Sequence, residues 1–88
     1  MEKEVKIAMV MSASSALKYL ESKPHADTEE VLKHVMKEIR LQKEEKIAGI
    51  AAANFVLKYK EKKPKATEKE VMQNLANSTT SILEEIER

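Results

Sequence analysis

The chain has 88 residues and a formal net charge of +1, because sixteen Lys and Arg stand against fifteen Asp and Glu. Apolar residues make up 42% and charged residues 35%, with one Gly, two Pro and no Cys. The length fits one domain over residues 1–88. The missing cysteines exclude a disulfide scaffold, and the scarcity of turn glycines and aromatic residues disfavours a small β-sandwich. The composition therefore predicts an all-α domain.

The first predicted helix covers residues 2–22, a stretch without Gly or Pro that ends before Pro24, since proline disfavours helix at the preceding residue. Its apolar segment at 7–11 has the composition of a short signal-peptide core. However, Glu2 and Glu4 cancel the positive charge expected ahead of such a core, and the segment is too short to span a bilayer. We therefore expect a domain helix, a cytoplasmic location and no membrane association.

The second predicted helix begins after Asp27, which can cap its first turn, with Glu30 at the capping-box position. Its apolar residues recur at helical spacing and form one stripe: Val31, Leu32, Val35, Met36 and Ile39. One face of this helix is therefore expected to be buried.

No proline interrupts the chain between residues 27 and 63, and the polar connection at 40–46 is favourable for helix. The apolar stripe stays in phase across it, because Leu32 and Ile50 are eighteen residues, or five full turns, apart. One alternative is a continuous helix over about residues 28–62, roughly 50 Å long, whose neighbours pack on a second chain in a swapped dimer. The other is a turn near residues 40–44 that closes a four-helix bundle. We favour the turn.

The chain contains an internal duplication. A shift of 40 residues places Lys6–Val35 on Lys46–Leu75 without a gap, and thirteen of these thirty positions are identical. The matches include Tyr19 with Tyr59 and Pro24 with Pro64, so chance matching of Lys and Glu does not explain them. The sequence therefore predicts a tandem duplicated helical hairpin, with an internal repeat at 3–40 and 43–80.

The first helix of each copy is rich in small side chains, which let two helix backbones approach closely. They are Ala8, Ser12, Ala13 and Ala16 in one copy, and Ala48, Gly49, Ala51, Ala52 and Ala53 in the other. Alanine is also a good helix former, but the recurrence at matched positions favours close packing. We predict a four-helix bundle with pseudo-twofold symmetry, in which the first helices pack on each other and the second helices cover the flanks.

The last predicted helix begins after Thr67, with Glu70 in the capping-box position. Its stripe comprises Val71, Met72, Leu75, Ile82, Leu83 and Ile86. Polar side chains at 77–81 compete for backbone hydrogen bonds, so we expect a kink or fraying there; one helix with a polar strip is the alternative.

No set of residues suggests catalysis. The sequence has no Gly-rich phosphate loop and no nucleophile beside a base. Glu30, His34 and Glu38 share a helix face at a spacing that can hold a metal, but the second copy carries Glu70, Asn74 and Ser78 there. Such side chains are usually solvated. We expect a protein that is not an enzyme, with no catalytic residues, cofactor or metal.

The first helices are apolar over most of their circumference, which one small bundle does not cover fully. We therefore expect a binding or assembly protein that acts through protein–protein association, as a homodimer or with another protein partner. The candidate interface residues are Met9, Ala13, Ile50, Ala51 and Phe55.

The alternative is a small nucleic-acid-binding protein. One basic face carries six lysines and only two acids, Glu61 and Glu68, between them. The candidate contacts are Lys58, Lys60, Lys62, Lys63, Lys65 and Lys69. Lysines can bind phosphates, but this face has no arginine, the residue that most often recognises bases. It also has too few aromatic residues to stack on the bases of a single strand.

Overall fold

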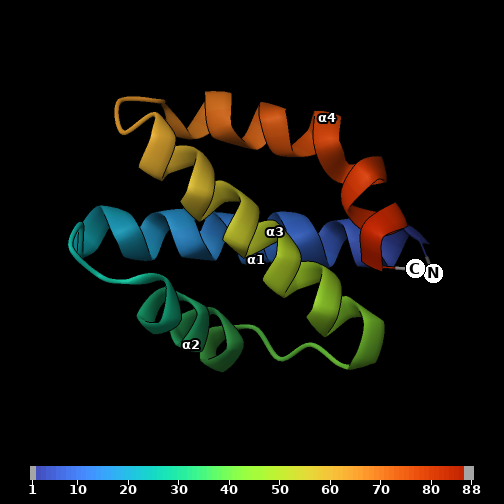
Figure 1. The fold of residues 1–88 in the computed structure, drawn as a ribbon. Coiled ribbons are helices and arrows are strands. Elements are labelled where there is room, and N and C mark those ends of the chain that lie inside the picture. The colour runs from blue at the N-terminus through green and yellow to red at the C-terminus, as the bar shows by residue number, and fades with distance from the viewer. Residues whose placement is uncertain (1, 87–88) are drawn as a thin grey trace.

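The computed structural model describes residues 2–86, and within them the chain forms four α-helices and no strands. The helices are α1 (Glu2–Ser22), α2 (Thr28–Glu38), α3 (Lys43–Lys62) and α4 (Glu68–Ile86). α1 and α3 cross at the centre, and α2 and α4 lie on either side of them (Figure 1). The all-α prediction is confirmed, and the helices form a bundle.

The caps that begin α2 and α4 are the ones that the sequence predicts. The Glu30 N–H donates to Asp27 Oδ1 at 2.8 Å, and the Glu70 N–H donates to Thr67 Oγ1 at 3.1 Å. The capping boxes are only half formed, because each glutamate carboxylate accepts a tyrosine hydroxyl: Tyr19 OH on Glu30 and Tyr59 OH on Glu70, both at 2.7 Å. These glutamates therefore tie each helix start to the helix before it.

A turn separates α2 from α3, so the continuous helix over residues 28–62 is wrong. Ile39 has extended backbone angles, φ −112° and ψ 111°, and Lys43 has a positive φ of 48°. The longest extent of the molecule is 33 Å, shorter than that helix would be. The swapped dimer that the long helix required is withdrawn with it.

Packing of Leu41 explains this turn. A Cβ built on Gly49 would stand 2.6 Å from Leu41 Cδ1, so the leucine lies directly against α3. In one continuous helix the two residues would be about 12 Å apart along the axis. Helix propensity is a weak preference that tertiary packing overrides, and here the chain folds back so that Leu41 packs on α3 and Val31 and Val35 of α2 are buried.

Lys43→Gly is expected to raise the free energy of unfolding by about 1 kcal/mol, because glycine adopts a positive φ without the steric cost that a side chain carries. Urea denaturation measures the change. Glu44→Gly, one residue further into α3, is the control and is expected to destabilise. A loss of about 1 kcal/mol in Lys43→Gly would instead indicate an ordinary helical position and contradict the turn.

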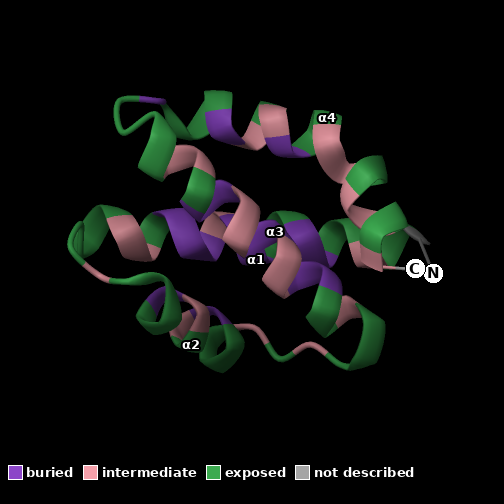
Figure 2. Cartoon of the chain, viewed as in Figure 1, coloured by how far each residue is buried: buried purple, intermediate pink, exposed green. Residues whose placement is uncertain are grey.

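The centre of the molecule is the α1–α3 crossing, where the buried residues gather (Figure 2). Small residues from both helices meet there and are buried: Ala8, Ser12, Ala13, Ala16, Ala48, Gly49, Ala52 and Ala53. At Gly49 an added Cβ would stand 2.5 Å from Ser12 Oγ. A side chain at this position would therefore have to displace the side chains of Ser12 and Leu41.

α4 continues through its polar stretch without a break, so the expected fraying does not occur within the described residues. Thr79 Oγ1 donates to Leu75 O at 2.9 Å, a local hydrogen bond of the kind that bends helices. Figure 1 shows the last turns of α4 bending toward the start of α1.

Candidate functional site

Two turns, at residues 23–27 and 63–67, lead from α1 into α2 and from α3 into α4; we call them the Lys-Pro turns. In the first, the Lys23 N–H donates to Tyr19 O at 2.8 Å and the Ala26 N–H to Lys23 O at 3.0 Å. Lys23 Nζ lies 5.4 Å from the centre of the Tyr19 ring. Tyrosine, lysine and proline together fix the path of this turn.

The second Lys-Pro turn repeats these contacts 40 residues later. The Lys63 N–H donates to Tyr59 O at 2.8 Å, and the Ala66 N–H donates to Lys63 O at 3.0 Å. Lys63 Nζ lies 5.6 Å from the centre of the Tyr59 ring. The two turns therefore share these backbone hydrogen bonds.

The pKa of Tyr59 is raised above its usual value near 10, first because its hydroxyl donates to the Glu70 carboxylate, then through desolvation and the Glu70 charge. Deprotonated Tyr59 could no longer donate this hydrogen bond, and its negative charge would lie beside the Glu70 carboxylate. Because the folded pKa is raised, this contact stabilises the fold below the unfolded pKa, and its contribution is lost as pH rises through the folded pKa.

Glu70→Gln is accordingly expected to lower the Tyr59 pKa toward about 10. Phenolate absorbance, titrated in a Tyr19→Phe background, reports Tyr59 alone, since the sequence has two tyrosines and no tryptophan. Glu68→Gln is the control and should leave the titration unchanged. An identical pKa with and without Glu70 would contradict this assignment.

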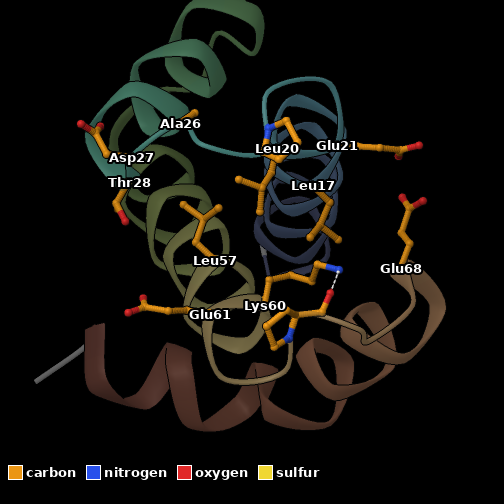
Figure 3. A pocket seen from close by; sticks show the side chains of 12 residues that line it. Leu17, Leu20, Glu21, Ala26, Asp27, Thr28, Leu57, Lys60, Glu61 and Glu68 are labelled. Atoms are coloured by element: carbon orange, nitrogen blue, oxygen red, sulfur yellow. Dashed lines mark hydrogen bonds between the residues drawn. The ribbon is translucent and has the colours of Figure 1, made fainter.

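A cleft of about 650 Å³ lies between the two Lys-Pro turns (Figure 3). Its lining comes from the ends of α1 and α3, the turns, and the starts of α2 and α4. Five pairs of lining residues occupy matching positions of the repeat: Leu17 and Leu57, Leu20 and Lys60, Glu21 and Glu61, Pro24 and Pro64, Thr28 and Glu68. Ala26 and Asp27 complete the lining. The cleft has leucines on its walls and carboxylates on its rim.

One cation lines this cleft within the described residues. Lys60 Nζ donates to Pro64 O at 2.9 Å (Figure 3) and to Ala66 O at 2.9 Å, and so closes the second Lys-Pro turn. Leu20, its counterpart in the repeat, makes no such bond. The signal for this role in the sequence is the replacement of Leu20 by Lys60 between two turns that share Tyr, Lys and Pro at matching positions.

The candidate interface residues divide into two groups. Met9 is 1% exposed and Ala13 is buried, so both lie inside the chain at the α1–α3 crossing and are not available to a partner. Ile50, Ala51 and Phe55 are half-buried on α3. Ile50, Ala51 and Phe55 are therefore partly accessible to a partner, whereas Met9 and Ala13 belong to the core.

A more exposed apolar strip lies on α1 itself. Ile7, Val10 and Met11 are 50%, 51% and 50% exposed and recur at i, i+3 and i+4, so they share one helix face. They line a shallow depression together with Lys3 and Lys6. We call Ile7, Val10 and Met11 the α1 strip. The signal in the sequence was their position opposite the small residues that pack on α3.

The six candidate phosphate-binding lysines are not equivalent. Lys60 is held by two carbonyls, and Lys63 lies over the Tyr59 ring. Five of the six are exposed: Lys58, Lys62, Lys63, Lys65 and Lys69. The basic face is therefore smaller than the sequence predicts.

The face of Glu30, His34 and Glu38 holds ordinary side-chain contacts. His34 Nε2 lies 3.0 Å from Glu38 Oε2, and the His34 ring stacks on Tyr19 with 4.3 Å between ring centres. In residues 2–86 no group of three or more His, Asp or Glu side chains is arranged to hold a metal ion. No helix in this range has the length and apolar character needed to cross a membrane.

Comparison with protein families, curated proteins and solved structures returns no match for this chain.

Proposed function

We propose that this is a non-enzymatic assembly protein that self-associates as a homodimer through the α1 strip. The observation that supports this most directly is the exposure of Ile7, Val10 and Met11 to about half of their surface on a helix whose opposite face is fully buried. Isolated exposed apolar residues are common, but three adjacent ones on one helix face form a patch of the kind that marks interaction sites.

A second copy of the chain is the partner that this strip fits best. A helix face can pack against its own copy across a twofold axis, since the same patch serves both subunits. The net charge of +1 gives little repulsion between copies. A chain of this size also buries only about 60–65% of its unfolded surface, so burial of three further apolar side chains would add to its stability.

We also infer that residues 3–40 and 43–80 are two copies of one hairpin related by a pseudo-twofold axis. The matching hydrogen bonds of the two Lys-Pro turns and the central α1–α3 crossing support this. The duplication matters for function because it offers matched pairs of residues. Ile7 and Ile47 occupy the same repeat position and are 50% and 54% exposed, yet only Ile7 lines the depression.

Amide NMR shifts, recorded over a dilution series of the full chain, test this proposal. Association through the α1 strip is expected to move the amide signals of residues 6–11 with concentration and to leave those of α2 in place. Signals that do not depend on concentration would contradict self-association. Movement centred on α3 would assign the contact to Ile50, Ala51 and Phe55 instead.

Nucleic-acid binding is the second candidate, supported by the five exposed lysines of the basic face. Affinity for a DNA or RNA duplex is then expected to fall steeply with salt, because phosphate contacts release counterions. Reversing the charge of Lys62 and Lys65 together should weaken binding. Binding that is independent of salt, or none at low salt, would remove this candidate.

A further inference from the structure

Lys60 shows where the Lys-Pro turn accepts an ammonium group. Its Nζ donates to Pro64 O and Ala66 O, two carbonyls that point to one place. With this ammonium in position, Ala66 is only 8% exposed. The second half of the molecule therefore carries its own cation in a site made of two backbone acceptors.

The first half has the same acceptors without that cation. The turn at 23–27 has the same backbone hydrogen bonds as the turn at 63–67, to within 0.1 Å, so Pro24 O and Ala26 O are arranged like their counterparts. Leu20 occupies the repeat position that matches Lys60. Among the described residues, no side chain donates to Pro24 O or Ala26 O. Ala26 is correspondingly more exposed than Ala66. Both Pro24 and Ala26 line the cleft.

The surroundings of this place suit a cation on an alkyl chain. Figure 3 shows Glu21 and Glu68 on the side of the cleft toward which Lys60 points, and Asp27 and Glu61 on the opposite side. Leu17, Leu20 and Leu57 lie between the two sides. The four carboxylates are exposed at the rim, and with the one ammonium they leave the lining three net negative charges. The side with Asp27 and Glu61 has no lysine in the lining.

We propose that this cleft binds a linear aliphatic diamine or polyamine, with one primary ammonium donating to Pro24 O and Ala26 O. The methylene chain lies along Leu17, Leu20 and Leu57, and the second ammonium reaches the carboxylates of Glu21 and Glu68. This ligand reproduces in the first half what Lys60 provides in the second. The site is independent of the proposed association, because it shares no residue with the α1 strip.

The chemistry of the walls favours an amine over other ligands. The start of a helix attracts anions, but here Asp27 and Glu68 occupy the starts of α2 and α4 and would repel an anion. An extended peptide is held by a row of backbone donors and acceptors along a strand edge, and residues 2–86 contain no strand. The charge of the walls thus favours a cation over an anion.

Titration of the full chain with cadaverine at neutral pH, followed by amide NMR and calorimetry, tests the proposal. Saturable binding of one cadaverine per chain is expected, with shifts at residues 20, 21, 26 and 68. Pentanediol, the uncharged analogue, should not bind. Nα-acetyl-lysine methylamide should bind more weakly than cadaverine, because it has no second ammonium; equal or tighter binding would overturn the diamine in favour of a partner's lysine side chain.

The repeat supplies the decisive variants. Leu20→Lys gives the first half its own internal ammonium and is expected to weaken cadaverine binding at least about tenfold, as the loss of charge-assisted hydrogen bonds implies. Gln73→Lys adds the same charge at an exposed position on α4 outside the cleft and should leave affinity unchanged. Lys60→Leu frees the second pair of carbonyls and should raise the stoichiometry from one to two.

Three results would overturn the site. The first is shifts spread over all acidic surfaces of the chain, the second is equal losses in Leu20→Lys and Gln73→Lys, and the third is unchanged stoichiometry in a folded Lys60→Leu variant. Circular dichroism checks the fold of each variant. Should Lys60→Leu fail to fold, the comparison of Leu20→Lys with Gln73→Lys still decides the question. A chain that does not bind cadaverine could still show amide shifts at residues 6–11 that depend on protein concentration. The failure of the amine site and the failure of self-association are therefore distinguishable.

Discussion

Gly49→Leu is expected to lower the free energy of unfolding by about 3 kcal/mol, the upper part of the range for overpacking. Even a Cβ at this position would stand 2.5 Å from Ser12 Oγ and 2.6 Å from Leu41 Cδ1. A leucine therefore forces α1 and α3 apart and displaces the residue that stabilises the α2–α3 turn. For a chain of this size the midpoint of thermal unfolding should fall by roughly 10–20 °C.

Ala51→Leu is the matched control, because Ala51 lies two residues away and is only half-buried. It should cost clearly less than Gly49→Leu, because a side chain at position 51 is already partly in solvent. Gly49→Ala is expected to cost less when combined with Ser12→Ala, since the second change removes the closest atom and a buried hydroxyl that has no hydrogen-bond partner. Additive effects in this pair would contradict the close approach of the two helices.

Ile7→Glu is expected to weaken self-association by roughly thirtyfold or more, the size of a change at the centre of an interface. The substitution places a charge in the middle of the α1 strip, where the second copy would have to desolvate it. The fold should tolerate it, because Ile7 is half exposed. Sedimentation equilibrium gives the dissociation constant of each variant.

Ile47→Glu is the control for that change. It makes the same substitution at the matching repeat position, on a side chain that is equally exposed and lies outside the depression lined by the α1 strip. It is expected to leave association nearly unchanged. Equal losses from both variants would mean that the contact is not confined to α1.

Local signals in the sequence predicted the two Lys-Pro turns well. The prolines at 24 and 64 mark the turns, and the capping residues Asp27 and Thr67 make the bonds expected of them. Both signals depend only on neighbouring residues, so they can be recognised without the tertiary structure. The apolar periodicity of α2 likewise identified Val31 and Val35 as buried.

The α2–α3 turn and the cleft depend on contacts between distant residues. Polar residues at 40–46 favour helix locally, and only the packing of Leu41 on Gly49 decides for a turn. The cleft forms because two turns, forty residues apart in the sequence, meet at one end of the bundle (Figure 3). Periodicity did not separate Met9, which is buried against α3, from its exposed neighbours Val10 and Met11, because α1 is apolar on both faces.

Light scattering of the purified chain over a range of concentrations tests the proposed function most directly. The α1 strip predicts a molar mass that rises with concentration to twice that of the chain, 10.0 kDa. It also predicts that Ile7→Glu remains at the mass of one chain under the same conditions. A wild-type chain that stays at the mass of one copy at every concentration would contradict the assembly function.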